Sequence, residues 1–319
     1  MPLITVFTPT FNRANKLYRV FESLQKQTFR DFEWVIVDDG SADNTTEVVE
    51  GFKKMDTDFA IVYHRQKNAG KHIAVNKAVD LANGYFFHNA DSDDAIVPNA
   101  LQEFLNAWQS IPEDKKQFYC GIWACCKDQF GKRVSDPVPG KIYVGSLRDL
   151  YYKYGFRKEA IHIYKTSVMK EFPFPTNLQN IYFPEGIIWR KMTDKYLIKL
   201  IDKELRIYYI ENTGDSIISG KISAKGRALT RCLESSDILN SDLAWFFSSK
   251  FYFLKWALVY ASFRPFLSAK DKIYFALKGK ALLLYLPLLI PGLIINFMFR
   301  IKDAYGLILK KTINDKKDI

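Results

Sequence analysis

Two groups of acidic side chains have the type and spacing to act together chemically. Asp38 and Asp39 follow one apolar run, and a second group, Asp91-Ser92-Asp93-Asp94, follows another. In an open α/β sheet, ligands bind beside the carboxyl ends of the strands. Carboxylates gathered there suit a hard divalent cation, which usually also holds a diphosphate. The two groups therefore predict a site for a nucleotide diphosphate and a metal.

Apolar runs typical of strands alternate with amphipathic segments around these acids. The expected strands are Leu3–Phe7, Phe32–Val37, Phe59–His64 and Tyr85–Asn89. Between the first two, apolar residues from Leu17 to Leu24 have the spacing of one buried helical face. Strands that alternate with helices in this way predict right-handed βαβ units. We therefore expect an α/β fold with a Rossmann-like, mostly parallel sheet flanked by helices.

Composition and charge divide the chain into two parts. With 48% hydrophobic and 25% charged residues, the 319-residue chain has the composition of a globular protein. The formal net charge is +11, and it is concentrated in Phe246–Ile319, which contains 13 Lys or Arg and 4 Asp or Glu. A basic block attracts nucleic acid or anionic lipid, and the apolar character of this block favours a membrane surface over nucleic acid.

Several common protein classes are disfavoured by the motifs. The sequence contains no P-loop lysine motif, no GxGxxG and no GxSxG. This argues against a P-loop NTPase, a dinucleotide enzyme and an α/β-hydrolase. The four cysteines have neither the spacing of metal ligands nor the pattern of an extracellular disulfide framework, so we expect reduced thiols.

An uncharged segment, Ala281–Phe299, dominates the basic part of the chain. It is close to the roughly 20 residues that span a bilayer, but Pro287, Pro291 and Gly292 interrupt it. Both flanks are basic, and positive flanks favour the cytoplasmic side. We expect a kinked segment that dips into one leaflet; a true span and a buried core or oligomer contact are the alternatives.

Four motifs in order carry a resemblance to a known family. They are Thr8-Pro9-Thr10-Phe11-Asn12-Arg13, Val37-Asp38-Asp39-Gly40-Ser41, the stretch Asn68–Ala78, and Asp91-Ser92-Asp93-Asp94. Over roughly residues 1–215, the chain resembles the family-2 inverting glycosyltransferases of GT-A fold. The last motif matches the DxD motif of that family.

The resemblance implies roles for individual residues. The implied nucleotide-sugar-binding positions are Thr8, Pro9, Asp38, Asp39, Gly70, Lys71, Asn76 and Asp91. Asp39 would bond the nucleobase, usually uracil, and Lys71 would meet a phosphate. Asp93, together with Asp91, would hold a divalent metal, Mn²⁺ or Mg²⁺.

An inverting transfer also needs a base that takes the proton of the acceptor hydroxyl. In the family this base belongs to a Glu-Asp motif, and the matching stretch here contains Glu185 followed by Gly186. Since the usual Asp is absent, Glu185 is the expected catalytic base. Its simpler role would be a negative charge at a helix N-terminus, where the helix dipole favours it.

These inferences predict a metal-dependent inverting glycosyltransferase at the cytoplasmic face of the membrane. Residues 1–225 would form the GT-A domain, with a nucleotide-sugar half (1–110) and an acceptor half (111–225), and 237–319 a helical membrane-attaching tail. The donor would be a UDP-sugar, and the acceptor a glycan or lipid-linked glycan in cell-surface polysaccharide synthesis.

Two other functions remain possible from the sequence. A catalytically inactive, nucleotide-binding membrane partner of another transferase is one, because Gly186 replaces the usual acid. A sugar nucleotidyltransferase is the other, although Thr8–Arg13 lacks the glycine and lysine of its triphosphate loop.

Overall fold

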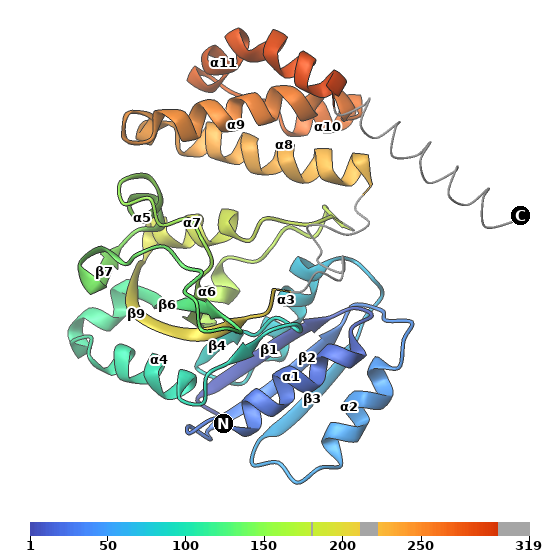
Figure 1. The fold of residues 1–319 in the computed structure, drawn as a ribbon, viewed down its shortest axis with the longest axis vertical. Coiled ribbons are helices and arrows are strands. Elements are labelled where there is room, and N and C mark those ends of the chain that lie inside the picture. Colours follow the sequence, from blue (N-terminus) through green and yellow to red (C-terminus); the bar gives the residue numbers. More distant parts are fainter. Residues whose placement is uncertain (180, 211–222, 299–319) are drawn as a thin grey trace, which may run out of the picture. The chain divides into compact units, whose positions relative to one another are not determined.

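The computed structural model describes residues 1–179, 181–210 and 223–298. The chain divides into two compact units, Met1–Ser216 and Ile217–Ile319 (Figure 1). The first contains the sheet, and the described part of the second is helical. The helical part begins before residue 237, because α8 runs from Ala224 to Ser241 and the Ser223 side chain caps it by accepting from the Gly226 amide.

One nine-stranded sheet organises the first unit, in the order β3-β2-β1-β4-β8-β6-β9-β5, with β7 paired to β9. Its first half contains β1 (Ile4–Thr10), β2 (Phe32–Asp38), β3 (Ala60–Arg65) and β4 (Phe86–Asn89). These four strands are all parallel. Their carboxyl ends therefore share one edge of the sheet, which is the arrangement that the βαβ pattern predicts.

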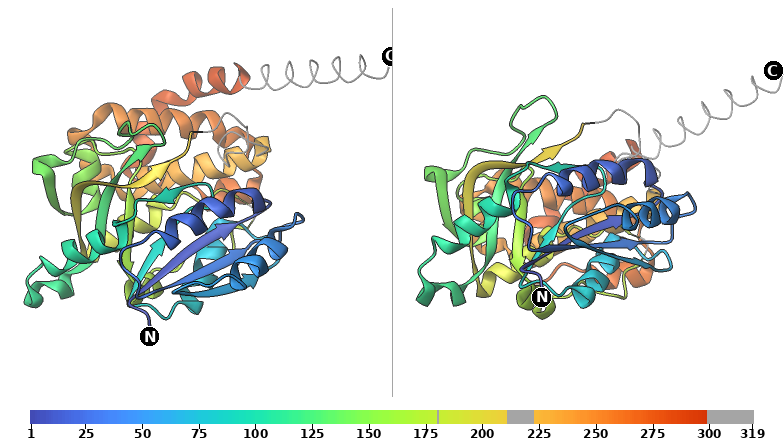
Figure 2. Two further views of the ribbon diagram at one scale, coloured as in Figure 1. Left: turned by 60° about the horizontal axis from the view of Figure 1, so that its bottom comes forward. Right: turned by 90° about the horizontal axis from the view of Figure 1, so that it is seen from below.

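Helices cover both faces of this parallel half (Figure 2). α1 (Ala14–Gln25) and α2 (Thr45–Lys53) share one hydrophobic core with Trp34 of β2, and the rings of Phe21 and Phe52 stack at 4.3 Å. Alternate strand side chains point to the other face. There α3 (Lys71–Leu81) packs against β1 and β2.

The second half of the sheet is mixed. It contains β5 (Ala95–Ile96), β6 (Tyr119–Asp128), β7 (Ile142–Gly145), β8 (Ile161–Lys165) and β9 (Leu197–Tyr208). β8 lies antiparallel between β4 and β6, and β9 runs parallel to β6 but antiparallel to β5 and β7. All pairs are parallel in the half where strands and helices alternate regularly; after β4 the chain loses that alternation, and the pairing becomes mixed.

Four helices belong to this half of the first unit. They are α4 (Ala100–Gln109), α5 (Leu147–Tyr152), α6 (Thr166–Glu171) and α7 (Gly186–Lys195). α4 joins the same hydrophobic core as α1 and α2 through Leu101, Phe104 and Trp108. The two halves of the sheet are therefore one folded body.

The second unit contains α8, α9 (Lys250–Phe263), α10 (Ala269–Tyr274) and α11 (Lys280–Tyr285). After α11 a 3₁₀ turn, Leu286–Leu288, accommodates Pro287, and helix continues to Met298. The 19-residue segment Lys280–Met298 is long and apolar enough to cross a membrane, and 22% of it is buried. The expected proline interruption is thus a local tightening within a helix, while Phe299 lies outside the described residues.

The pairing of β6 with β8 in the mixed half of the sheet depends on a glycine. A Cβ on Gly121 of β6 would lie 2.0 Å from the carbonyl oxygen of Ile163 in β8. We predict that Gly121→Ala lowers the free energy of unfolding by roughly 1–3 kcal/mol, as overpacking does. Gly51→Ala in α2 is the matched control, because its Cβ would meet no atom within 4 Å. It should stabilise the protein by roughly 0.5–1 kcal/mol. Urea unfolding measures both; equal effects would contradict the prediction.

Candidate active site

The ends of the parallel strands bring the two acidic groups to one edge of the sheet. Asp39 follows β2, and its amide donates to the Thr10 carbonyl at the end of β1 (2.9 Å). Ala90 follows β4, and its amide donates to the Phe7 carbonyl (2.8 Å). These bonds tie the segments after β2 and β4 to β1. The expected convergence of the acids on one edge is therefore present.

Asp39 organises the loop that leads into α3. Its carboxylate accepts from the Gln66 side chain (2.8 Å), the Ala69 amide (2.9 Å) and the Gly70 amide (2.8 Å). The side chain is buried. This carboxylate fixes the backbone where the expected donor-binding stretch begins, whatever it contacts in a ligand.

Asp38 and Thr8 lie deeper and have partners inside the protein. The buried Asp38 carboxylate accepts from the Ser41 amide and the Tyr63 hydroxyl, each at 2.8 Å. The Thr8 hydroxyl accepts from the Trp34 indole at 2.9 Å. Pro9 lies next to Thr8 in the buried strand β1. All three support the edge of the sheet from within.

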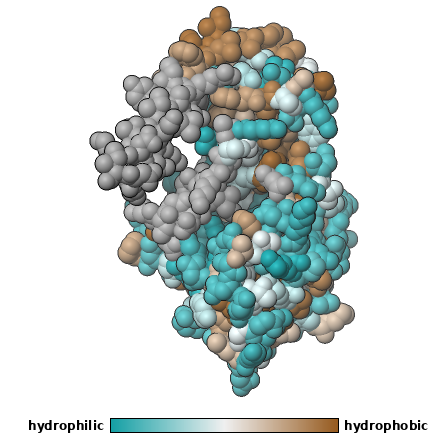
Figure 3. Space-filling view, turned by 90° about the vertical axis from the view of Figure 1, so that its right-hand side faces the viewer, coloured by the Kyte–Doolittle hydropathy of each residue, from teal (hydrophilic) through white to brown (hydrophobic). Residues whose placement is uncertain are grey.

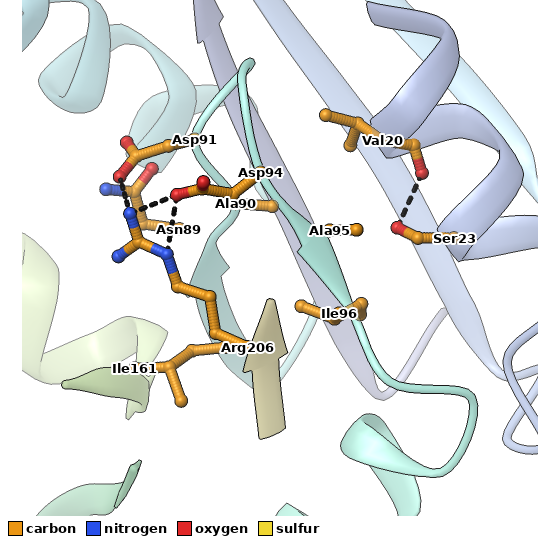
Figure 4. Close-up of a pocket in the computed structure, with 10 residues that line it drawn as sticks. All are labelled: Val20, Ser23, Asn89, Ala90, Asp91, Asp94, Ala95, Ile96, Ile161 and Arg206. Atoms are coloured by element: carbon orange, nitrogen blue, oxygen red, sulfur yellow. Dashed lines mark hydrogen bonds and ion pairs between the residues drawn. The ribbon is translucent and has the colours of Figure 1, made fainter. Parts of the chain in front are cut away.

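Arginines neutralise the acids after β4. Arg206 of β9 donates through Nε to Asp94 (2.6 Å) and through Nη2 to both Asp94 and Asp91, the latter at 3.1 Å (Figure 4). Arg13, just before α1, pairs with Asp93 at 2.9 Å and donates to Ser92 at 3.2 Å. Each acid thus faces a cation that comes from a distant part of the chain.

The electrostatics differ among these acids. Burial alone would raise the pKa of Asp91, but Lys71 and Arg206 hold that pKa well below its usual range. Burial raises the pKa of Asp94 to about 6, although Arg206 opposes the shift. Asp91 is therefore firmly ionised, whereas Asp94 is the more readily protonated of the two.

Lys71 connects Asp91 to the expected base, Glu185. Its Nζ lies 2.6 Å from Asp91 and 2.9 Å from Glu185. Burial would lower the pKa of Lys71, but the two carboxylates hold it above its usual value. Three expected site residues from α3, the turn after β4 and the start of α7 thus meet in one cluster.

Glu185 occupies the N-cap of α7, yet its side chain makes no capping hydrogen bond. Its carboxylate reaches Lys71 instead. A purely helix-capping role accounts poorly for this geometry. Gly186 next to it has room for a side chain, since a Cβ there would lie no closer than 3.6 Å to Arg190.

Gly70 and Asn76 shape the surroundings of Lys71. Gly70 has φ +108°, and a Cβ there would lie 3.0 Å from the His72 imidazole, so this position requires glycine. The Asn76 side chain accepts from the Phe174 amide (2.9 Å) and donates to the Phe174 carbonyl (2.8 Å). Asn76 therefore holds the loop at Phe174, which follows α6, against α3.

The metal expectation can be tested against the donor set. Two carboxylates of a DxD motif at the strand edge, Asp91 and Asp93, have the oxygen chemistry that Mn²⁺ or Mg²⁺ prefers. Among the described residues, no group of three or more His, Cys, Asp and Glu side chains could hold a metal. Within the described residues, Asp91 and Asp93 would therefore fit a metal only if donor phosphates supplied further oxygen atoms.

Two arginines in this cluster were not among the expected site residues. Arg13 belongs to a motif that was recognised, so its position was available as a signal. Arg206 gave no signal in the sequence, because it lies 112 residues after Asp94 and reaches it only through the pairing of β9 with β5.

Fold and site together define a class of protein: a GT-A-type α/β fold with acidic motifs gathered at its parallel edge. The glycosyl transferase family 2 model matches residues 5–172, more than half of the chain. The chain belongs to this family and is a glycosyltransferase.

Curated relatives share this assignment. The GalNAc(5)-diNAcBac-PP-undecaprenol beta-1,3-glucosyltransferase of Campylobacter jejuni is 26% identical over 249 residues, which cover 76% of each chain. The glycosyltransferase EpsH of Bacillus subtilis is 34% identical over 192 residues. That match covers 56% of this chain and 53% of EpsH, so the chain spans about half of that relative.

Solved structures share the fold. S. aureus TarS 1-349 in complex with UDP-GlcNAc superposes with a TM-score of 0.58 at 20% identity, covering 92% of this chain and 80% of TarS. The mannosyltransferase PcManGT from Pyrobaculum calidifontis, in complex with GDP-Man and Mn²⁺, gives 0.56 at 16% identity, with 93% and 87% covered. At these identities the likeness establishes the fold alone.

The Asp39 contacts generate a stability prediction that needs no nucleotide. Asp39→Ala removes the acceptor of three hydrogen bonds, so the free energy of unfolding should fall by roughly 1–3 kcal/mol. Asp80→Ala on the exposed surface of α3 is the control and should change it by less than about 0.5 kcal/mol. Denaturant unfolding without ligand measures both. Equal losses would show that Asp39 does not hold the loop.

Proposed function

We propose that this glycosyltransferase moves a sugar, with inversion, from a UDP-sugar to a hydroxyl of a lipid-linked glycan. The observation that carries the proposal is the Lys71 bridge between Asp91 and Glu185. It joins an acid of the expected donor site to the expected base. Donor and acceptor chemistry would then occur within one cluster.

In the proposed reaction, Glu185 takes the proton of the acceptor hydroxyl. The hydroxyl oxygen attacks the anomeric carbon from the face opposite the nucleoside diphosphate, and the bond from that carbon to the diphosphate oxygen breaks. Negative charge develops on the departing diphosphate. Lys71, Arg13 and Arg206 lie among the acids of this edge, and their positive charges would offset the charge that develops on the diphosphate.

Asp91 and Asp93 would hold the divalent metal, Mn²⁺ or Mg²⁺. When bound, the metal neutralises diphosphate charge. Arg13 pairs with Asp93 and Lys71 with Asp91, so both cations would have to shift as metal and donor enter.

The classes that we propose for the donor and the acceptor are taken from the comparisons with known proteins. TarS is described with UDP-GlcNAc, and the Campylobacter relative is named for an undecaprenol-linked acceptor. By analogy, the chain would act in cell-surface polysaccharide synthesis, at the cytoplasmic face of the membrane. The apolar helix Lys280–Met298 would bring it to that surface.

The deciding experiment is a donor screen with the purified full chain. UDP-sugars should give metal-dependent release of UDP, and UDP should bind more tightly than GDP or CDP. Slow donor hydrolysis is expected even without an acceptor. No nucleotide release from any donor, with or without undecaprenol-linked acceptors, would favour the second candidate.

The second candidate is a catalytically inactive, nucleotide-binding partner of another transferase. Gly186, where the family has an Asp, is the observation that favours it. Gly186→Asp tests the point directly, because the position has space for a side chain. An inactive chain that gains donor hydrolysis through this change would support the partner role.

The base generates a kinetic prediction. Glu185→Gln keeps the shape of the side chain but cannot take a proton, so kcat should fall by roughly 10²–10⁴-fold while UDP affinity changes little. Glu171→Gln, an exposed glutamate of α6, is the matched control and should stay near wild type. Steady-state transfer and UDP titration provide the two readouts. A Glu185→Gln enzyme within threefold of wild type would place the base elsewhere.

The metal generates a second prediction. Asp93→Asn should abolish transfer without lowering the unfolding temperature by more than a few degrees, because the side chain is partly exposed (31%) and outside the core. A chelator should likewise abolish turnover, and Mn²⁺ or Mg²⁺ should restore it. Metal-dependent stabilisation of the UDP complex gives a readout besides activity. Full turnover in excess chelator would exclude metal dependence.

A further inference from the structure

The second unit has an unusually apolar exposed surface. Of the large hydrophobic side chains that are exposed among the described residues, 13 of 24 lie between Phe247 and Met298. Figure 3 shows apolar surface gathered over this part of the chain. A patch of this kind marks a site of interaction with another molecule or a membrane. The packing and the charges of this part of the chain indicate which of these partners the patch fits.

The helix Lys280–Met298 is held to α9 by a specific inner face. A Cβ on Gly292 would lie 2.4 Å from the Cβ of Ala261, so the two helices approach as closely as glycine allows. The Asn296 side chain donates to the Ser262 carbonyl at 2.7 Å. The ring of Tyr285 contacts that of Tyr260 edge-on at 5.3 Å. The helix thus has a buried side with its own packing.

The opposite face of the same helix is exposed and apolar. Leu283, Leu286, Ile290, Ile294 and Phe297 recur at helical spacing, and each is at least half exposed. No charged residue occurs between Ala281 and Met298. This helix therefore presents hydrocarbon where a water-facing helix would present polar groups.

Charges around the patch favour an anionic partner. Between Ser223 and Met298 there are ten Lys or Arg and four Asp or Glu. Lys250, Lys270, Lys278 and Lys280 are exposed and stand within four residues of exposed apolar side chains. A large apolar face with a basic rim is the signature of an interfacial membrane helix.

We infer that helix Lys280–Met298 lies in the plane of one leaflet of an anionic bilayer while it stays packed on α9. Its outward face, defined above by the residues from Leu283 to Phe297, inserts among the acyl chains, and the lysines meet anionic headgroups. This inference deepens the membrane attachment in the proposed function and rests on it. It differs from a span, which would have to strip the Gly292 and Asn296 contacts from α9.

Vesicle flotation tests the surface. The full chain should float with phosphatidylcholine–phosphatidylglycerol vesicles more strongly than with pure phosphatidylcholine. Ile290→Ser combined with Phe297→Ser should reduce bound protein at least about tenfold, since two large apolar groups are lost. Phe130→Ser, which removes a still more exposed aromatic side chain from the first unit, is the matched control and should float like wild type.

Cysteine labelling tests the in-plane arrangement. The four native cysteines are buried, so an added cysteine dominates the reaction with a membrane-impermeant maleimide. In sealed inside-out vesicles from producing cells, Lys278→Cys and Met298→Cys should both react, because both ends stay on one side. Ile290→Cys should be protected and, once labelled in detergent, quenched by a lipid-borne quencher after reconstitution.

The outcomes separate this inference from the proposed function. UDP-sugar hydrolysis is measured on the same variants without vesicles, and it should be unchanged. If the unsubstituted protein does not hydrolyse UDP-sugars, this result would count against the transferase proposal and not against the membrane inference. Labelling of Lys278→Cys with protection of Met298→Cys would mean a span and overturn the inference. A full chain that does not float, but forms a dimer that the Ile290→Ser/Phe297→Ser change dissociates, would overturn the inference. The apolar face would then be covered by a second copy of the chain.

Discussion

Carboxylates crowded at one sheet edge are the constraint on which the rest of the first unit depends. Asp91, Asp93 and Asp94 follow one strand within a single turn, and like charges at that spacing destabilise a fold unless cations lie beside them. The compensating cations come from three distant segments, in the form of Arg13, Lys71 and Arg206. Neutralising the site therefore also joins the segments that build it.

Arg206 illustrates the consequence. It belongs to β9, in the mixed half of the sheet, and its guanidinium reaches the acids that end the parallel half. Removing one partner from such a pair costs more than the pair contributes, because the other charge stays buried and unpaired. Under the proposed function, stability and nucleotide binding would therefore depend on the same few side chains. A diphosphate donor would compete with the acids for cations already assembled.

In the second unit the constraint is an apolar helix face that is exposed. The last described helix of this unit has one face that packs on α9 through Gly292 and Asn296, and another that has no polar group to offer water. A helix that is apolar on both faces can be read from composition as a span. A span would break the contacts between the inner face and α9, so these contacts favour an arrangement in which the helix lies along the membrane surface.

The sequence by itself determined the parallel βαβ half and the edge at which the acids converge, and the family resemblance singled out Lys71 and Glu185 as separate candidates without predicting that they meet. It could do so because strand alternation and short motifs are local signals. Only the tertiary structure decided the mixed pairing of β8, β6 and β9, the pairing of Arg206 with Asp94, and the use of Asn76 to hold Phe174. These contacts join residues that lie from 37 positions (Ala124 and Ile161) to 112 positions (Asp94 and Arg206) apart, and no local pattern specifies which distant strand a side chain will face.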